Sequence, residues 1–177
     1  MRVDRPEIPD GYGAEAAGGY LSWDEVADRL TNARTYWLST TRPDGRPHVV
    51  PRWGAWLDGA FWYDGSPETR HAKNLAESGA CALSVEGDDE VTIVEGVSVA
   101  SDPIAGELGA RLSGELSRKY APMYTPAPDS WSDGTAGGLR TLTPAKVIAW
   151  GDFPGELTRF TLRPTRLGSG ALERRSR

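Results

Sequence analysis

The sequence contains few of the residues that build metal sites and nucleophilic centres. Its 177 residues include one cysteine and two histidines. No internal disulfide can therefore form, and a zinc site with three or four nitrogen and sulfur ligands is not expected. Cys81 has alanine and leucine neighbours, which favours a buried strand residue over a nucleophile. We predict no bound metal and a cytoplasmic location, because a chain without disulfides suits a reducing compartment.

Long apolar runs and an excess of positive charge are absent as well. No run approaches the roughly 18 apolar residues that a membrane-spanning helix requires, so no membrane contact is predicted. The formal net charge of −5 argues against a nucleic-acid partner, which usually requires a broadly basic surface. The length suits one domain. We expect a flexible N-terminal arm at 1–20, one folded domain at 21–163 and a basic tail at 164–177.

What the sequence does contain is a series of strand and turn signals. Aromatic and β-branched residues at 35–41 precede the turn Arg-Pro-Asp-Gly at 42–45, and Asp-Gly at 58–59 joins 46–57 to 60–64. The three strand segments are predicted to form an antiparallel meander. Further strands are predicted at 80–86, 90–101, 139–150 and 156–162, and helices at 22–34, 67–78 and 103–120. Mostly antiparallel strands with few helices favour a closed or split β-barrel.

The segment at the start of the second predicted helix is expected to bind an anion. Ser66 suits a helix N-cap and Pro67 the first helical position, so free backbone N–H groups and a positive dipole end would face a ligand. Arg70 and Lys73 lie three residues apart and therefore on one helix face. The preceding residues 34–53 carry four arginines and one aspartate. A basic region in an acidic chain indicates a small anionic ligand.

Two segments resemble one known family. They read Ser-Thr-Thr-Arg-Pro-Asp-Gly-Arg-Pro-His at 39–48, continued by Val-Pro-Arg-Trp-Gly-Ala-Trp at 50–56, and Gly-Ser-Pro-Glu-Thr-Arg-His-Ala-Lys-Asn-Leu at 65–75. Over residues 20–163 the chain resembles the pyridoxamine 5′-phosphate oxidase-like flavin and deazaflavin oxidoreductases. It is most similar to the actinobacterial branch that uses the deazaflavin coenzyme F420, and 17 arginines against three lysines suit a GC-rich genome. The resemblance implies a mainly β fold with flanking helices: a six-stranded antiparallel split β-barrel (the FMN-binding split barrel), assembled as a homodimer.

The same resemblance implies a function and a site. It implies an oxidoreductase that transfers hydride from reduced F420 to an activated C=C or C=O bond of a small organic acceptor, with cofactor sites at the subunit interface. The residues expected to contact the cofactor are His48, Val49, Val50, Pro51, Arg52, Trp53, Ser66, Thr69, Arg70, His71, Lys73 and Asn74, together with Lys146 and Trp150 from the partner subunit. The family often has lysine or arginine in place of His71, and Glu68 would repel a phosphate unless it points away.

Several roles stay open at this stage. The proton donor is His48, Tyr63, Tyr124 or water, and the arginines at 42, 46 and 52 are expected to hold an acidic substrate or an oligoglutamate tail. Loop 121–138 is expected to be functional, with Trp131 either capping a pocket or exposed. An FMN-dependent oxidase or reductase is an alternative, because FMN shares the phosphate and ribityl groups of F420. A non-catalytic flavin-, haem- or tetrapyrrole-binding protein is another, although few haem ligands are available.

Overall fold

The computed structural model of the chain describes residues 1–9, 18–133 and 138–162. These residues form one antiparallel sheet and three helices. The strands are β1 (Arg2–Asp4), β2 (Tyr36–Thr41), β3 (Pro47–Arg52), β4 (Ala55–Leu57), β5 (Ala60–Tyr63), β6 (Ala80–Glu86), β7 (Val91–Ala100), β8 (Arg140–Trp150) and β9 (Thr158–Thr161), and the helices are α1 (Trp23–Asn32), α2 (Arg70–Glu77) and α3 (Gly106–Tyr120). The expected mainly β fold with flanking helices is therefore confirmed, with nine strands in the described residues rather than six.

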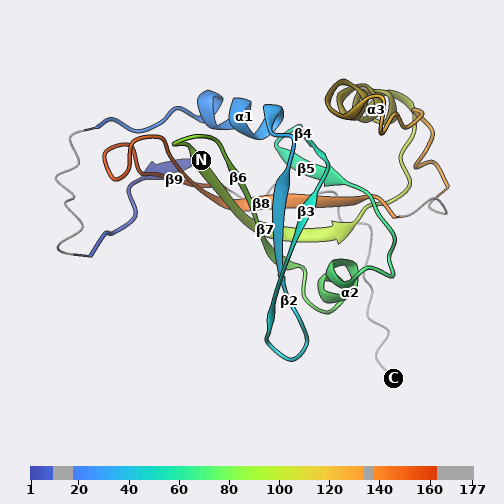
Figure 1. Cartoon of the computed structure of the whole chain (residues 1–177), viewed down its shortest axis with the longest axis horizontal. Helices are drawn as coiled ribbons and strands as arrows, with labels where there is room; N and C mark the ends of the chain where they lie inside the picture. Colours follow the sequence, from blue (N-terminus) through green and yellow to red (C-terminus); the bar gives the residue numbers. More distant parts are fainter. Residues whose placement is uncertain (10–17, 134–137, 163–177) are drawn as a thin grey trace.

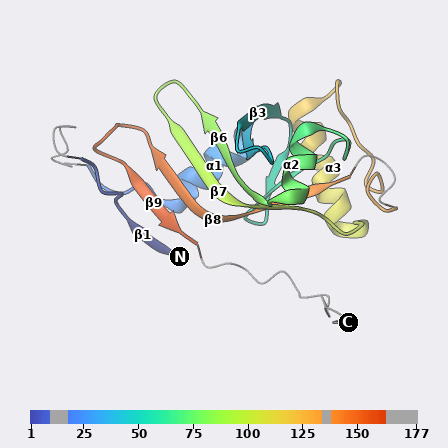
Figure 2. The ribbon, with the colours of Figure 1, turned by 90° about the horizontal axis from the view of Figure 1, so that it is seen from below.

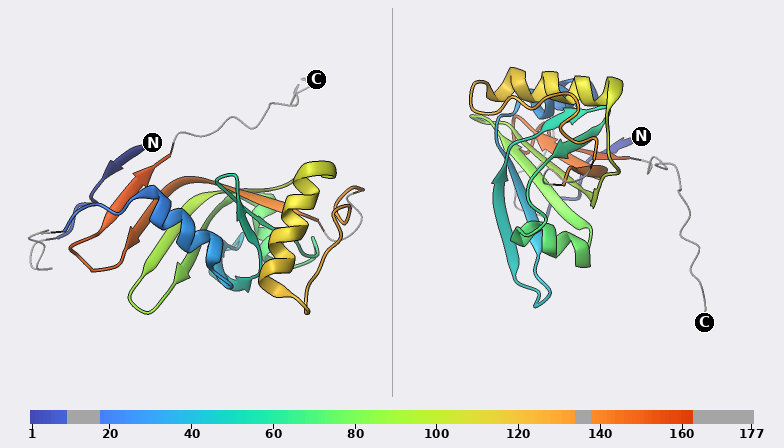
Figure 3. Two further views of the ribbon diagram at one scale, coloured as in Figure 1. Left: turned by 90° about the horizontal axis from the view of Figure 1, so that it is seen from above. Right: turned by 90° about the vertical axis from the view of Figure 1, so that its right-hand side faces the viewer.

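The sheet runs in the order β1-β9-β8-β7-β6-β2-β3, and the β4–β5 hairpin joins it where β5 pairs with β8. Helices α1 and α3 lie along one side of the sheet, while α2 lies on the other side, next to the β2–β3 hairpin (Figure 1). Figure 3, right, shows the same separation of α2 from α3. Strand β3 ends the path of paired strands, so one of its backbone edges is not covered by another strand.

The predicted hairpin turns are confirmed, but the predicted three-stranded meander is wrong. Gly45 has a φ of 83°, and Asp58 and Gly59 have φ of 53° and 74°, as tight hairpin turns require. The expected strand at 46–57 is wrong as a single element, because it divides at Gly54 into β3 and β4. A Cβ on Gly54 would lie 2.4 Å from the ring of Phe61, so the backbone passes directly against this ring. Strand β5 then pairs with β8.

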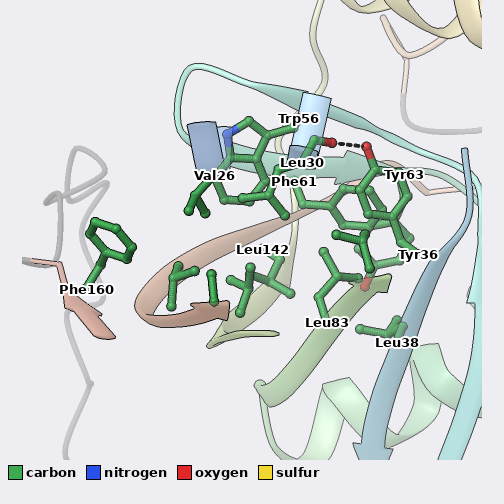
Figure 4. Close-up of a cluster of buried hydrophobic side chains, with 14 of the residues drawn as sticks. Val26, Leu30, Tyr36, Leu38, Trp56, Phe61, Tyr63, Leu83, Leu142 and Phe160 are labelled. Carbon is green, nitrogen blue, oxygen red and sulfur yellow. Dashed lines mark hydrogen bonds between the residues drawn. The ribbon is translucent and has the colours of Figure 1, made fainter. Parts of the chain in front are cut away.

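Buried side chains form two clusters. The larger one lies between α1 and the sheet and contains Val26, Leu30, Tyr36 and Phe61 (Figure 4). Residues of this size each stabilise the fold by roughly 1.5–3 kcal/mol when fully buried. The smaller cluster lies under α3 and consists of Ala55, Leu112, Leu116, Tyr120, Trp131 and Leu139. The second cluster therefore attaches α3 and the loop after it to the β4–β5 hairpin.

The N-terminal residues differ from the expected arm. Arg2–Asp4 form β1, which pairs with β9, and the Arg5 side chain donates hydrogen bonds to the carbonyls of Leu157 (3.2 Å) and Gly155 (2.8 Å). The expectation of a wholly flexible segment at 1–20 is therefore wrong for its first residues, because the backbone of β1 completes the free edge of β9. Figure 2 shows β1 and β9 at the opposite end of the molecule from α2 and α3. The expected tail at 164–177 lies outside the described residues.

Within the described ranges, none of the helices has the length and apolar character needed to cross a membrane.

Candidate functional site

Helix α2 begins at Arg70, three residues later than the predicted start at Pro67. Ser66 does not cap the helix, because its Oγ accepts the N–H of Glu68 (3.1 Å) inside a separate turn. Thr69 is the N-cap residue, but its hydroxyl donates to the carbonyl of Ser66 (2.9 Å) and makes no capping bond. The first turn of α2 also contains no acidic residue. Its N–H groups and positive dipole end are therefore left open by the chain's own side chains.

His71 lies in this first turn and is held neutral. Its side chain is only 4% exposed, and its Nε2 lies 3.3 Å from the hydroxyl of Thr69. Burial, followed by the positive charges of Arg52, His48 and Arg140, lowers the pKa of His71 to about 4. No carboxylate contributes to this shift. A buried imidazole surrounded by cations fits a place where an anionic ligand supplies the missing negative charge.

His48, on β3, faces the same positive field. Burial lowers its pKa, and the charges of Arg42 and Arg70 lower it as well. We call this group the basic cluster; its members are Arg42, His48, Arg52, Arg70, His71 and Arg140. Lys73 does not join it, because its Nζ pairs with Glu68 at 2.8 Å on the exposed side of α2. The carboxylate of Glu68 is therefore paired with a cation and largely exposed.

Two members of the basic cluster have buried nitrogen atoms without an acceptor. The guanidinium of Arg52 donates to the carbonyl of Asp64 and lies 5.6 Å above the ring of Tyr63, while its Nε has no partner among the described residues. Arg140 donates to the carbonyl of Ser98 (3.4 Å), and its Nε is likewise unpartnered there. Buried donors are normally satisfied. Their presence next to an open helix start fits an anionic group such as a phosphate ester.

Strand β3 offers a backbone edge for the remainder of such a ligand. The bond from the N–H of Arg42 to the carbonyl of Arg46 (2.9 Å) sets an alternation in which residues 47, 49 and 51 point their backbone groups away from β2. Two of these residues are prolines and have no N–H. The free edge therefore carries one donor, at Val49, and three carbonyl acceptors. An edge position is what Pro51 predicts.

Other predicted site residues lie in different surroundings. Tyr63 is 1% exposed, and its hydroxyl is 2.8 Å from the Oγ of Ser98, so it belongs to the core. Asn74 is also buried, and its Nδ2 donates to the hydroxyl of Thr40 (3.0 Å), which joins α2 to β2. Its Oδ1 has no partner among the described residues. Arg70 and His71 therefore both lie in the first turn of α2, whereas the side chain of Asn74 packs between α2 and β2.

The two residues expected from a partner subunit lie on β8, away from α2. Lys146 pairs with Glu95 (2.7 Å) at the edge of a cavity of about 540 Å³, which is lined by Ser39, Pro47, Cys81, Val97 and their neighbours. Trp150 lies at the other end of β8 and contacts the ring of Phe153 edge-on, at 5.6 Å. Burial raises the pKa of the Cys81 thiol to about 11, which disfavours the nucleophilic thiolate, in agreement with the sequence interpretation.

A second cavity, which we call the Trp53 cavity, was not predicted. It has a volume of about 250 Å³ and is lined by Pro51, Arg52, Trp53, Asp64, Leu116 and Tyr124. The Oδ2 of Asp64 accepts the hydroxyl of Tyr124 and the indole N–H of Trp131 (3.1 Å). Trp131 is 4% exposed, so the alternative of an exposed loop aromatic is wrong. It ties the loop after α3 to the end of β5.

A buried lysine supports one wall of this cavity. Lys119, on α3, is 3% exposed, and its Nζ donates to the carbonyls of Gly54 (3.0 Å) and Thr31 (3.1 Å) and to the hydroxyl of Tyr36 (2.6 Å). Burial lowers its pKa to about 8. Tyr120 receives the N–H of Gly54 (3.0 Å), and its ring stacks on Trp53 at 4.8 Å. Helix α3 therefore fixes the indole of Trp53.

Among the described residues, no three His, Cys, Asp or Glu side chains are grouped as metal ligands would be. Charged side chains also line the 540 Å³ cavity, so the basic cluster and the Trp53 cavity are two of several accessible charged surfaces in the part of the chain that the structure describes. They share Arg52, which lies between the start of α2 and the cavity.

The comparisons with known proteins agree with this architecture. The family profile for pyridoxamine 5′-phosphate oxidase matches residues 22–144. A conserved hypothetical protein from Mycobacterium tuberculosis is 24% identical over 76% of this chain and 88% of its own, with a TM-score of 0.63. A haem-binding protein from Mycobacterium smegmatis is 19% identical over 81% of this chain and 59% of its own (TM-score 0.60). A structure described as an F420 reductase is 22% identical over 79% and 98%, respectively (TM-score 0.51). Among curated proteins, none matches the sequence.

Proposed function

Because the chain belongs to the pyridoxamine 5′-phosphate oxidase family, we propose that it is an oxidoreductase that uses the deazaflavin coenzyme F420 to reduce a small organic acceptor. One observation carries the proposal. Among the described residues, the start of α2 has no side-chain cap and no acidic residue in its first turn, and it faces a cluster of cations that includes two guanidinium nitrogens without a partner. Such a terminus is suited to a phosphate group.

Different groups of residues bind the phosphate and the ring system of the coenzyme. The N–H groups of the first turn of α2, with Arg70 and the hydroxyl of Thr69, bind the phosphate. Arg52 and Arg140 supply further positive charge from the side of the sheet. The free edge of β3, at Pro47, Val49 and Pro51, contacts the ring system through backbone groups. Bound in this way, reduced F420 supplies a hydride from its ring carbon.

The chain's own part in the reaction is orientation and exclusion of water, since the acceptor must be held over one ring carbon. The activated bond of the acceptor, C=C or C=O, needs a proton at its other end. Tyr63 is enclosed in the core and bonded to Ser98. The hydroxyl of Tyr124 already donates to Asp64. The lowered pKa of His48 keeps its imidazole largely neutral at pH 7, so solvent water is the proposed proton source, with His48 as the alternative at lower pH.

We further propose a homodimer that uses the outer face of the sheet. This face presents Trp37, Val49, Val97 and Val99, which are between 39% and 54% exposed, around the 540 Å³ cavity. A contiguous exposed apolar surface of this kind is typical of an interface. Lys146 lies at its edge, where it would face the ligand of the other subunit. A Val97→Glu variant should dissociate the dimer in sedimentation equilibrium, whereas a monomeric wild-type protein would contradict the proposal.

A titration with two coenzymes tests the function. We expect F420 to quench tryptophan fluorescence and reduced F420 to be oxidised when an enone is added. Arg70→Ala should weaken F420 binding roughly ten- to hundredfold, the equivalent of about 1.5–3 kcal/mol for a charged hydrogen bond. The matched control is Arg118→Ala, because Arg118 is an exposed arginine that pairs with Glu115 on α3. Equal affinity of wild type and Arg70→Ala would place the phosphate elsewhere.

FMN is the second candidate, since the same phosphate site would hold it. Retention of FMN through purification, with no oxidation of reduced F420, would favour an FMN-dependent enzyme. Binding without turnover, with haem as the tightest ligand, would favour a non-catalytic haem-binding protein; haem binding is the property named for the Mycobacterium smegmatis structure.

A further inference from the structure

The Trp53 cavity has the features of a site for a flat ligand, and it opens beside the strand to which we assign the coenzyme. One face of the Trp53 indole stacks on Tyr120 with an angle of 13° between the rings, yet Trp53 remains 43% exposed. Pro51 and Leu116 add further apolar surface. At about 250 Å³ the cavity is smaller than the roughly 300 Å³ of the smallest drug-sized pockets, which suits one or two fused rings.

The polar groups of this cavity are distributed unevenly. Asp64 is a lining residue, and its carboxylate is oriented by the hydroxyl of Tyr124 and the indole N–H of Trp131. Arg52 also lines the cavity, but its guanidinium is directed past it, toward the carbonyl of Asp64 and the ring of Tyr63. A Cβ built on Gly65 would lie 2.8 Å from its Nη2, so the guanidinium is enclosed on that side.

The negative charge of Asp64 therefore disfavours the binding of an anionic ligand in the Trp53 cavity. The guanidinium of Arg52 is directed past the cavity toward a backbone carbonyl, whereas the carboxylate of Asp64 is held at the cavity by two donors. A carboxylate or sulfonate on the ligand would be brought close to a like charge in a partly desolvated site. From the sequence, Arg42, Arg46 and Arg52 are expected to hold an acidic substrate or an oligoglutamate tail, because a sequence does not show where their side chains point. Arg46, for example, is bonded to Asp44 at 2.7 Å.

We propose that the Trp53 cavity is the acceptor subsite and that Asp64 makes it selective for uncharged planar acceptors over anionic ones of the same shape. Only the identification of the bound ligand as a hydride acceptor rests on the proposed function. The charge selection belongs to the cavity and can be measured without coenzyme. Asp64 acts here as a specificity-determining residue, and Tyr124 and Trp131 position its carboxylate.

The experiment compares two probes of equal ring size, 2-methyl-1,4-naphthoquinone and 1,4-naphthoquinone-2-sulfonate, by quenching of tryptophan fluorescence in the full chain. Wild type should bind the neutral quinone at least tenfold more tightly. Asp64→Asn should reduce this ratio to threefold or less, because the amide keeps an acceptor for Tyr124 and loses the charge. The matched control is Asp58→Asn, an exposed turn aspartate that pairs with Arg111, and it should leave the ratio unchanged.

Two further variants keep the test decisive. Trp53→Phe should remove most of the quenching if the probe lies on this indole. Pro51→Lys adds a positive charge at an exposed lining position, and it should shift the preference toward the sulfonate even if Asp64→Asn folds poorly. Equal wild-type affinity for both probes, an unchanged ratio in Asp64→Asn, or full quenching in Trp53→Phe would each overturn the proposal.

The outcome is separable from that of the proposed function. A protein that selects the neutral probe but never oxidises reduced F420 would retain the charge selection and lose the assigned reaction. A protein that reduces both quinones equally with F420, in wild type and in Asp64→Asn, would retain the reaction and lose the role of Asp64.

Discussion

Helices α1 and α2 begin in opposite ways. In α1, the Ser22 hydroxyl accepts the N–H of Glu25 (3.2 Å), and the carboxylate of Glu25 accepts the N–H of Ser22 (2.8 Å), so the chain closes its own helix end. In α2, Thr69 makes no capping bond, and the first turn has no acid. A serine precedes both helices, yet only one of them caps. Side chains of the described residues thus close the start of α1 and leave the start of α2 open, which is the condition that the proposed phosphate site needs.

The largest expected difference between the two helix starts is in how acidification changes the free energy of unfolding. The folded-state pKa of His71 is about 4, below its unfolded value of 6.5, so the unfolded chain binds the extra proton first. Stability is then fully present above pH 6.5 and is lost as the pH falls toward 4, by on the order of 3 kcal/mol. Urea unfolding between pH 7 and pH 4.5 measures this loss.

His71→Gln is the variant that isolates the effect, since it removes the titrating ring and should flatten the profile in this window. The Ser22 contacts lower the pKa of Glu25 from its usual 4.5, so its stabilising effect disappears only at still lower pH. Between pH 6.5 and pH 4.5, the contribution of the α1 start to stability should thus stay constant, while that of the α2 start falls. An equally steep loss in His71→Gln between pH 6.5 and 4.5 would show that His71 is not the source.

The start of α2 also shows where local sequence rules end. Ser22-Trp-Asp-Glu25 predicts a capping box and forms one. Ser66-Pro67 carries similar signals, but the hydroxyl of Ser66 bonds to Glu68 and makes a turn instead. In both cases the serine hydroxyl accepts a backbone N–H two or three residues further along the chain. The sequence predicts that a helix follows, and it predicts the hairpin turns at 42–45 and 58–59 for the same local reason.

The Trp53 cavity could not be predicted, because its contacts join distant parts of the chain. Asp64 bonds to Tyr124 and Trp131, which follow it by 60 and 67 residues, and Lys119 bonds to Gly54 across 65 residues. No spacing rule relates these residues. The division of 46–57 at Gly54 was missed for a related reason, since the ring of Phe61 that requires glycine there becomes a neighbour only in the folded sheet.

Supplying α2 with the cap that it lacks should give the next largest effect. Thr69→Asp places a carboxylate at the N-cap, where it accepts the open N–H groups and stabilises the helix by about 0.5–1 kcal/mol. The same carboxylate competes with a phosphate, and F420 binding should weaken by roughly 30-fold, about 2 kcal/mol. Stability and affinity therefore change in opposite directions in one variant, as measured by thermal unfolding and fluorescence titration.

The reciprocal change at α1 serves as the control. Ser22→Ala removes the capping hydroxyl and should cost about 1 kcal/mol of stability, with F420 affinity unchanged. If Thr69→Asp bound F420 as tightly as wild type, the open helix end would not be the phosphate site. If Ser22→Ala also weakened binding, the comparison between the two helix starts would lose its meaning.

The smallest effect should come from Lys73, although its spacing from Arg70 suggests equal roles. The ammonium of Lys73 is 2.8 Å from Glu68, and both side chains are largely exposed, so it is directed toward solvent rather than the helix start. Lys73→Ala should weaken F420 binding by no more than about threefold, in contrast to Arg70→Ala, because exposed pairs are screened. Glu68→Ala should strengthen binding by a similar small factor, since it releases Lys73 and removes a negative charge near the phosphate. Titrations at low and at physiological salt measure both changes; a tenfold loss in Lys73→Ala would show that Lys73 leaves Glu68 to bind the phosphate directly.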